Sequence, residues 1–311
     1  MPNELISVVI PTRNRPEMVL RAVKSVLAQT HVALEVLVVV DGPCQRTMLA
    51  LSEITDARLR VIELPASVGG SDARNTGVQS SKSAWIAFLD DDDEWMPTKL
   101  ERQLAVAKDA EELYPVISCK VVAASPSGEF IWPRRLPAPS EPICEYLFNR
   151  KSLFKGESLL QTSTLFAPRI LLEAVPFTSG LQRFQDYEWC LRVAELSGAQ
   201  FHFVPEPLVT WHIEAGRESI SNRNDWMLAL EWLRSNRSRM TRRAYAGFIS
   251  ASLAQQASAQ GDWRVAWQLF KEMFRNGRPG YMEISLFTAI WMTPTSLRRR
   301  MRALLHPKAA Q

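Results

Sequence analysis

The sequence predicts an α/β fold with a mostly parallel sheet, followed by a helical region at the C-terminal end. Short apolar runs rich in valine and isoleucine alternate with helical patterns over the first hundred residues. These runs are apolar at consecutive positions, as expected of strands that are covered on both faces of a parallel sheet. Polar residues follow three of the runs, at the sheet edge where open parallel sheets bind ligands.

Four strands are predicted in the first hundred residues, with helical or loop segments between them. The runs are LISVVIP, LEVLVVVDG, RLRVIEL and AWIAFLD, at residues 5–11, 34–42, 58–64 and 84–90. Thr12 and Arg13 follow the first strand, Asp41 ends the second, and Asp90 begins the polar run after the fourth. The alternative is that each polar group is a solvated turn, but three strands deliver such groups to one edge.

Two helices in this part begin at prolines, which favour the first turn of a helix. Pro16 opens the first, and Pro97 opens the second. The apolar residues that recur at helical spacing are Val19, Ala22, Val23 and Val26 in the first and Leu100, Leu104 and Ala107 in the second. We expect these residues to face the sheet.

The chain changes character twice beyond these helices. The stretch IWPRRLPAPSEPIC, at residues 131–144, predicts a long loop over a site. Beyond it, DWMLALEWLRS, RRAYAGFISASLAQQASAQG and DWRVAWQLFKEMFRNG predict helices interrupted at Gly261 and Gly277. The predicted domains are a catalytic domain, residues 1–221, with halves 1–115 and 116–221, and a helical region, residues 222–311.

Composition excludes several classes of protein. The net charge of +4 is mild, so we expect no nucleic-acid partner. The four cysteines lie far apart with no C-x-x-C pair, which argues against a zinc site or a disulfide framework and favours a reducing cytosol. No secretory signal is recognised at the N-terminus. The late apolar run ISLFTAIWM is far shorter than the roughly 20 residues that span a bilayer.

The stretch IAFLDDDDEW carries four consecutive aspartates, Asp90 to Asp93, followed by Glu94. Adjacent carboxylates repel one another, so they need a cation or open water opposite them. Carboxylate oxygens at a strand end suit Mg²⁺ or Mn²⁺, which could also bind substrate phosphates. A solvated acidic run is the alternative.

The stretch VGGSDARNTGV favours a phosphate site. Its two glycines, Gly69 and Gly70, allow close approach of the backbone, and Arg74 offers a planar cation suited to phosphate near the start of a predicted helix. It is no P-loop. The alternative is a plain turn with an arginine on the surface.

Three segments together carry a family resemblance: SVVIPTRNRPEMVLRAVKSVLAQTHVALEVLVVVDG, GGSDARNTGV and WIAFLDDDDEWMPTKLERQ. In this order and spacing the chain resembles the family 2 glycosyltransferases, inverting enzymes of the GT-A fold that use nucleotide-activated sugars. The resemblance is dense over residues 5–104, looser to about residue 221, and absent beyond. It implies a Rossmann-like sheet with flanking helices and a glycosyltransferase of the hexosyltransferase type.

The resemblance also implies roles for individual residues. Pro11, Thr12 and Arg13 would cradle the base and ribose, Asp41 would accept a hydrogen bond from the uracil or thymine imide, and Arg74 would meet the diphosphate. The family's D-x-D pattern is matched by Asp90, for ribose and diphosphate-metal contacts, and by Asp92, for the metal. Asp91 is counted with the nucleotide-sugar contacts, and the alternative register pairs it with Asp93.

An inverting transfer needs a base for the acceptor hydroxyl, and a carboxylate is a common solution. The segment RFQDYEWCLRVAEL predicts a helix with Asp186 at its N-terminal end, and the resemblance matches Gln185 and Asp186 to the family's acidic pair. Asp186 is the predicted base and Glu188 the reserve, with a simple helix cap as the alternative.

Two further segments predict contacts, one with the metal or a phosphate and the other with a membrane. In LVTWHIEAGRESIS the resemblance implies that His212 is a metal ligand or phosphate contact, with a packed histidine as the alternative. The basic segment SLRRRMRALLHPK has Leu297, Met301 and Leu305 at helical spacing. It predicts peripheral contact with an anionic membrane, with a solvated helix as the alternative.

These observations predict a cytoplasmic enzyme, peripheral on the inner face of the membrane if the basic segment binds there. It would use Mn²⁺ or Mg²⁺ to transfer a sugar, with inversion, from a nucleoside diphosphate, expected to be UDP, to a glycan or lipid-linked acceptor in bacterial envelope polysaccharide synthesis. Specificity should lie in residues 120–165 and around Asp186. The alternatives are a sugar-phosphate nucleotidyltransferase, although PTRNRP lacks the glycine-rich loop expected there, and a non-catalytic scaffold with a vestigial site.

Overall fold

The computed structural model describes residues 4–126, 128–152, 156–213 and 225–293. The chain forms two compact units: Met1–Ile131 with Leu160–Ala215, and Trp132–Leu159 with Gly216–Gln311. This division differs from the predicted one, which placed all of residues 116–221 with the catalytic domain. Residues 132–159 are too poor in regular periodicity for their partner to be read from sequence.

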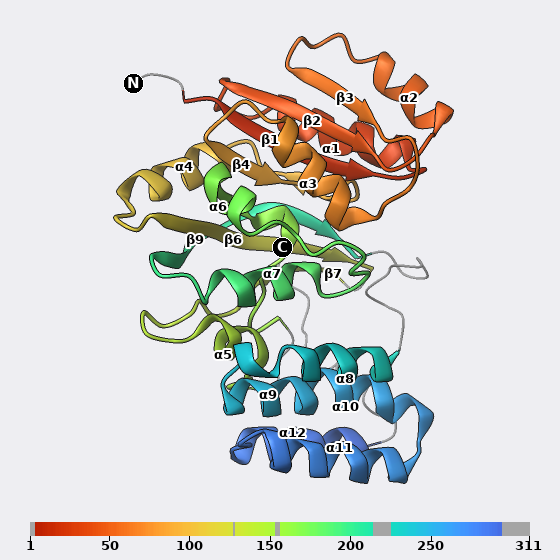
Figure 1. The fold of residues 1–311 in the computed structure, drawn as a ribbon, viewed down its shortest axis with the longest axis vertical. Coiled ribbons are helices and arrows are strands. Elements are labelled where there is room, and N and C mark those ends of the chain that lie inside the picture. Colours follow the sequence, from red (N-terminus) through yellow and green to blue (C-terminus); the bar gives the residue numbers. More distant parts are fainter. Residues whose placement is uncertain (1–3, 127, 153–155, 214–224, 294–311) are drawn as a thin grey trace. The chain divides into compact units, whose positions relative to one another are not determined.

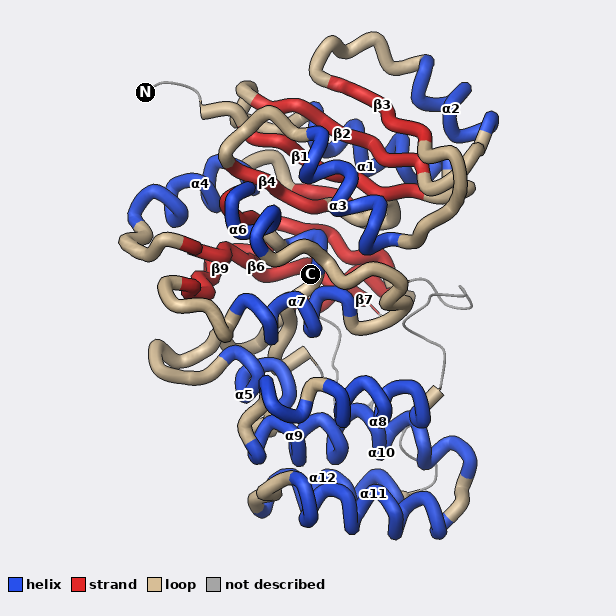
Figure 2. The backbone as a smooth tube through the Cα atoms, viewed as in Figure 1, coloured by secondary structure: helices blue, strands red, loops and turns tan. Residues whose placement is uncertain are grey.

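The first unit is built on a nine-stranded sheet of order β3-β2-β1-β4-β8-β6-β9-β5, with β7 paired to β6 (Figures 1 and 2). Its strands are β1 (Ile6–Thr12), β2 (Leu34–Val40), β3 (Leu59–Glu63), β4 (Trp85–Phe88), β5 (Glu94–Trp95), β6 (Tyr114–Ser125), β7 (Gly128–Trp132), β8 (Phe166–Pro168) and β9 (Ala199–His212). Strands β3, β2, β1 and β4 are mutually parallel, β8 is antiparallel to both neighbours, and β6 runs parallel to β9. The predicted mostly parallel sheet is confirmed.

The direction of the chain changes beside β1, which fixes the site. Strands β1, β2 and β3 proceed outward across the sheet, and β4 then returns to the other side of β1. Right-handed crossovers therefore put α1 (Pro16–Leu27) and α2 (Gln45–Ser52) on one face and α3 (Gly70–Ser80) on the other. Ligands in such sheets bind at this switch point, beyond the carboxyl ends of the strands.

The predicted strands and the first helix agree closely with the structure. Helix α1 begins at Pro16, and all its predicted apolar residues are buried. Strand β1 is buried along almost its whole length, whereas the edge strand β3 is only half-buried. Helix α4 (Lys99–Asp109) starts two residues after Pro97. The first unit also contains α6 (Arg169–Ala174), α7 (Gln185–Val193) and the short helix η1 (Thr162–Thr164).

Helix α3 packs closely on β1 because it carries a glycine at the contact. A Cβ atom on Gly77 would lie 2.3 Å from Cγ1 of Val9. Gly77→Ala is therefore expected to destabilise the protein by about 1–3 kcal/mol through overpacking. Urea unfolding measures the effect. In a double-mutant cycle, Val9→Ala should recover part of the loss in the Gly77→Ala background, and strictly additive effects would contradict the predicted contact.

The second unit is helical. Its elements are α5 (Ile143–Phe148), α8 (Trp226–Ser235), η3 (Arg237–Arg239), α9 (Arg242–Phe248), the π-turn η4 (Ile249–Leu253), α10 (Ala254–Ala257), η5 (Ser258–Gln260), α11 (Trp263–Asn276) and α12 (Tyr281–Met292). Side chains of Asp225, Thr241 and Asp262 cap α8, α9 and α11. Gly261 ends the middle helical segment with φ of 69°, as its glycine predicted.

Two predictions in this unit have different outcomes. The predicted loop of residues 131–144 is largely irregular, but its first two residues end β7 and its last two begin α5. The basic segment with Leu297, Met301 and Leu305 lies outside the described residues. Among the helices that the structure describes, none has the length and apolar character needed to cross a bilayer.

Candidate active site

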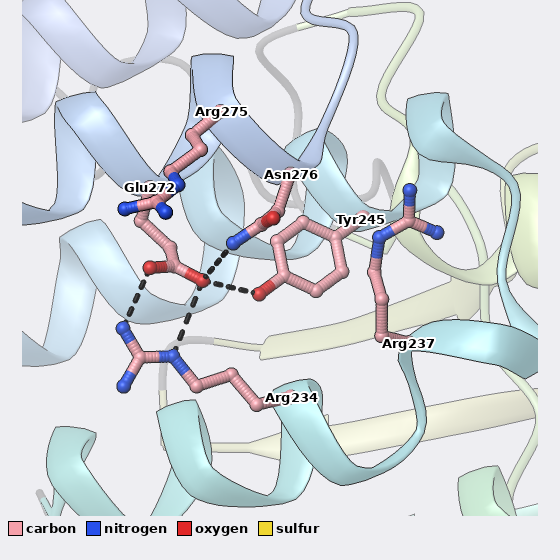
Figure 3. Close-up of a pocket in the computed structure, with 6 residues that line it drawn as sticks. All are labelled: Arg234, Arg237, Tyr245, Glu272, Arg275 and Asn276. Carbon is pink, nitrogen blue, oxygen red and sulfur yellow. Dashed lines mark hydrogen bonds and ion pairs between the residues drawn. The ribbon is translucent and has the colours of Figure 1, made fainter.

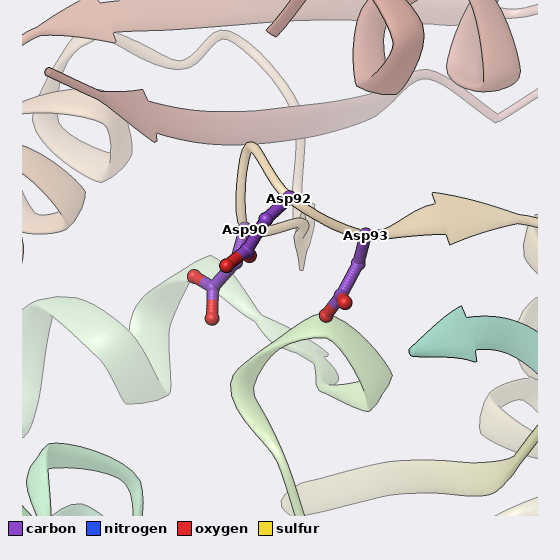
Figure 4. Close-up of side chains that lie close together, drawn as sticks. All are labelled: Asp90, Asp92 and Asp93. Carbon is purple, nitrogen blue, oxygen red and sulfur yellow. The ribbon is translucent and has the colours of Figure 1, made fainter. Parts of the chain in front are cut away.

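Three carboxylates gather at the turn between β4 and β5, at the carboxyl end of β4 (Figure 4). They belong to Asp90, Asp92 and Asp93, and one oxygen of each lies within 4.8 Å of the others. The backbone N–H of Asp93 donates to the carbonyl oxygen of Asp90, at 3.1 Å, which closes the turn. We call these three residues the carboxylate cluster.

Arginines compensate part of the negative charge of the acidic run. Arg74 pairs with Asp90, Arg15 pairs with Asp91 at 2.9 Å, and Arg21 pairs with Glu94 at 3.2 Å. Asp92 has a longer contact, 3.7 Å, with Arg15. Within the described residues, no lysine or arginine pairs with Asp93. Among the described residues, Asp93 is therefore the aspartate of the acidic run whose charge no lysine or arginine compensates.

Asp93 is the most enclosed member of the cluster, only 1% exposed. Its Oδ2 accepts hydrogen bonds from Ser163 and Gln161, both at 2.6 Å. Its buried Oδ1 has no hydrogen-bond partner among the described residues. Burial, and then the charges of Asp92 and Asp90, raise the pKa of Asp93 well above its usual value. A buried oxygen without a donor, beside two further carboxylates, fits a hard divalent cation such as Mn²⁺ or Mg²⁺.

The side chain of Asp91 is bonded to residues outside the carboxylate cluster. Its carboxylate accepts hydrogen bonds from Thr12, at 2.7 Å, and from Arg15, at 2.9 Å. Burial raises the pKa of Asp91 to about 6, although Arg15 opposes the shift. Both oxygens are thus engaged with β1 and the turn after it, which favours Asp90 and Asp92 over the alternative register of Asp91 and Asp93.

The predicted base-binding residues lie together at the ends of β1 and β2. Asp41 follows β2, and its N–H donates to the carbonyl oxygen of Thr12 at 2.8 Å. Its carboxylate accepts hydrogen bonds from the side chain of Ser67 and from the backbone of Val68 and Gly69. Asp41 therefore holds the loop before α3. Its contact with a nucleobase stays a prediction, as do those of the half-buried Pro11 and the exposed Arg13.

Arg74 links the acidic run to α7. Its guanidinium donates to Asp90 and, at 2.7 Å, to Oε1 of Gln185, and it lies over the ring of Phe177. Its Nε has no hydrogen-bond acceptor among the described residues. The predicted role of Arg74 toward a diphosphate is not tested by this geometry, but the side chain is already fixed beside the carboxylate cluster.

Asp186 lies at the second position of α7. Phe184, just before the helix, adopts a left-handed conformation with φ of 63°, which is uncommon for a non-glycine residue and is often found at functional sites. The Asp186 carboxylate accepts the N–H of Tyr187 at 2.8 Å. Burial raises the pKa of Asp186 to about 6, with Asp90 adding to the shift and Arg74 opposing it. A carboxyl group with such a pKa is suited to proton transfer near neutral pH.

Two other predicted residues have protein partners. Glu188, the reserve base, accepts hydrogen bonds from Arg192 and Thr178 and is buried. His212 ends β9, and its Nε2 lies 2.7 Å from Oε1 of Glu94. It is not part of the carboxylate cluster. The serine-containing stretch that follows His212 in sequence lies outside the described residues.

Sequence reasoning did not find several residues that shape this site. Ser163 also accepts the N–H of Asp90, at 3.1 Å, so η1 supports both ends of the turn. Neither Ser163 nor Gln161 stands in a recognisable motif, so only the fold brings them here. Arg15 lies within the PTRNRP run, and the cluster of cations there could have indicated its pairing with the acidic run.

Comparisons with known proteins identify the family of the sequence. The sequence model of the family described as "Glycosyl transferase family 2" matches residues 7–169, just over half of the chain. The amylovoran biosynthesis glycosyltransferase AmsB of Erwinia amylovora is 26% identical over 245 residues, covering 76% of this chain and 79% of that protein.

A shorter match reaches a relative with a named donor and acceptor. WfgD of Escherichia coli, a UDP-Glc:alpha-D-GlcNAc-diphosphoundecaprenol beta-1,3-glucosyltransferase, is 33% identical over 106 residues, which are 34% of this chain and 42% of that protein.

Among solved structures, S. aureus TarS in complex with UDP-GlcNAc has a TM-score of 0.54 at 15% identity and covers 96% of this chain and 79% of that chain. At this identity the similarity shows the GT-A fold alone. Together with the family match, which runs from β1 to β8 and includes the acidic run, it identifies the chain as a glycosyltransferase that belongs to glycosyl transferase family 2.

Proposed function

We propose that this protein transfers a sugar, with inversion, from a nucleoside diphosphate sugar to a hydroxyl group, in a reaction that depends on Mn²⁺ or Mg²⁺. The observation that carries the proposal is the carboxylate cluster, with the unpartnered Oδ1 of Asp93 inside it. Asp90, Asp92 and Asp93 would hold the cation. His212 stays a proposed metal ligand or phosphate contact: its Nε2 is bonded to Glu94, and a histidine that binds a metal through one ring nitrogen commonly bonds a carboxylate through the other.

The donor would lie beyond the carboxyl ends of β1, β2 and β4. UDP is the proposed nucleotide, supported by the UDP-glucose donor in the name of WfgD and by the fold shared with the TarS complex. The residues proposed to contact the base, ribose and diphosphate are Pro11, Thr12, Arg13, Asp41, Arg74, Asp90 and Asp91. When bound at the cluster, the divalent ion would neutralise negative charge that develops on the leaving diphosphate.

Asp186 is proposed as the general base. Its ionised carboxylate takes the proton of the acceptor hydroxyl while that oxygen bonds to the anomeric carbon. The bond from the anomeric carbon to the diphosphate oxygen breaks in the same displacement, and the electron pair leaves with the nucleoside diphosphate. Arg74, through Gln185 on one side and Asp90 on the other, keeps α7 in position relative to the acidic turn.

A glycan or lipid-linked saccharide is the proposed acceptor, and bacterial envelope polysaccharide synthesis is the proposed setting. The names of AmsB and WfgD support both. We also propose a location in the cytoplasm, at the inner face of the membrane, with the basic segment of residues 296–308 in contact with the lipid. The family match favours this transfer over a nucleotidyltransferase reaction.

Titration calorimetry with UDP, GDP and dTDP, each with and without Mn²⁺, tests the proposal. We expect UDP to bind in the micromolar range with Mn²⁺ and much more weakly after chelation of the metal. If GDP or dTDP binds and UDP does not, the nucleotide proposed for the donor sugar is wrong and the one that binds replaces it. If none of the three diphosphates binds with metal present, the proposed site is wrong.

A further inference from the structure

The outer side of helix α11 carries a stripe of four aromatic side chains. Trp263, Trp267, Phe270 and Phe274 follow one another at intervals of four, three and four residues, so they share one side of the helix. Trp263 is 60% exposed, Trp267 58% and Phe274 46%. Aromatic groups exposed together over this length usually mark an interaction surface.

A stripe of cations runs beside the aromatic one. Arg264, Lys271 and Arg275 are exposed, and each directly follows an aromatic residue of the first stripe. Nζ of Lys271 lies 5.0 Å from the centre of the Trp267 ring. We call the seven residues of the two stripes the aromatic-basic face. Asp262, just before it, is occupied in capping α11.

The acidic residue of α11 points away from this face. Glu272 is buried and accepts hydrogen bonds from Arg234, Tyr245 and Asn276, the shortest being 2.6 Å (Figure 3). The hydrogen bond with Arg234 is the main cause that lowers the pKa of Glu272 to about 2. The carboxylate is therefore ionised and neutralised inside the helical unit, which leaves the outer side of α11 positive.

The basic stripe leads into a pocket of about 320 Å³. Its lining consists of Arg234, Arg237, Tyr245, Glu272, Arg275 and Asn276. Among the described residues neither Arg237 nor Arg275 pairs with a carboxylate, whereas Arg234 pairs with Glu272. Two uncompensated guanidinium groups at the edge of the pocket suit the phosphate of a lipid headgroup.

Helix α12 packs against one side of the aromatic stripe through two buried rings. Trp291 contacts Trp263, with ring centres 5.9 Å apart, and Phe287 contacts Phe270 at 5.8 Å. Glu283, the acidic residue of α12, is 1% exposed and accepts the N–H of Gly280. Residues 225–311 carry 14 lysines and arginines against five acidic residues. The charge of this region is complementary to an anionic partner.

We propose that the aromatic-basic face rests on an anionic lipid bilayer. Tryptophan and phenylalanine beside lysine and arginine are the residues of helices that lie in a membrane interface, where the rings enter the headgroup region. The cations add attraction to anionic lipids. This contact goes beyond the proposed transfer, because it needs neither the donor nor the metal. It would hold an enzyme with a lipid-linked acceptor close to that acceptor.

Vesicle flotation tests the inference. The full chain should float with phosphatidylcholine vesicles that contain phosphatidylglycerol, and much less with phosphatidylcholine alone. Replacing both exposed tryptophans, Trp263→Ser with Trp267→Ser, should lower the partition coefficient by about tenfold or more. Replacing two cations, Arg264→Gln with Lys271→Gln, should weaken binding most at low salt. Leu49→Ser, at a position 60% exposed on α2, is the matched control and should float like the wild type.

Three results would overturn the inference. They are the absence of flotation with anionic vesicles, flotation of the double tryptophan variant equal to that of the wild type, and loss of a dimer in that variant with no vesicle binding by either protein. The last result would assign the face to a second copy of the chain. Thermal unfolding checks that each variant is folded, and nucleotide binding on the same samples separates this outcome from failure of the proposed function.

Discussion

Asp186→Asn is expected to reduce the rate of sugar transfer by about 10²–10⁴-fold, because an amide cannot take the acceptor proton. The substitution keeps the size and shape of the side chain, and the N–H of Tyr187 can still donate to its oxygen. Affinity for the nucleotide should therefore stay close to that of the wild type. Release of nucleoside diphosphate in the presence of acceptor measures transfer, and calorimetry measures binding.

The pH profile provides a second measure of the role of Asp186. Its pKa is raised from 3.8 to about 6, so the carboxyl group is protonated below that pH and ionised above it. A base must be ionised, and kcat/KM should therefore fall as the pH drops through about 6. The charged or titratable groups that interact electrostatically with Asp186 are Asp90, Arg74 and Cys190. The Glu188→Gln variant should show the same fall in kcat/KM at low pH as the wild type. Wild-type rates in Asp186→Asn would exclude Asp186 as the base.

Asp92→Asn and Asp93→Asn are each expected to weaken Mn²⁺-dependent binding of UDP by at least about 10–100-fold. Each removes one negative charge from the carboxylate cluster that would hold the ion. Calorimetry in the presence of Mn²⁺ measures the change. The difference in UDP affinity between the wild type and the variants should shrink when the metal is chelated, because the wild type then also lacks the bound ion.

Asp91→Asn is the matched comparison for these two variants. Its carboxylate binds Thr12 and Arg15 and is proposed to contact the nucleotide sugar, so its loss should weaken UDP binding to a similar extent with and without Mn²⁺. If Asp91→Asn and Asp93→Asn were the pair that lost metal-dependent binding, while Asp92→Asn kept it, the alternative register of the acidic run would hold.

The sheet could be predicted because its signals are local. Continuous apolar runs such as β1 and β2 have one stable environment, the interior of a covered parallel sheet, and Pro16 marks the start of α1. The same logic placed Asp41 and the acidic run at one edge, since polar residues at the carboxyl ends of parallel strands must lie there. The structure has them at that edge.

The finer arrangement of the site depends on contacts that sequence does not encode locally. Asp93 is distinguished from its neighbours by Ser163 and Gln161, which lie about seventy positions away. Periodicity cannot reveal such pairing. The resemblance predicts His212 as a metal ligand or phosphate contact, but the sequence does not reveal that the antiparallel pairing of β5 with β9 brings its ring to Glu94. The membership of residues 132–159 in the helical unit was also hidden, since irregular segments carry no pattern that names their partner.

Electron paramagnetic resonance of Mn²⁺ titrated into the protein with UDP tests the central claim most directly, since it reports the ion itself and not turnover. We expect the signal of free Mn²⁺ to be suppressed in proportion to the protein added, and much less by Asp92→Asn or Asp93→Asn. A free Mn²⁺ signal that the wild-type protein leaves unchanged, or that both variants suppress as strongly as the wild type, would contradict a metal site at the carboxylate cluster.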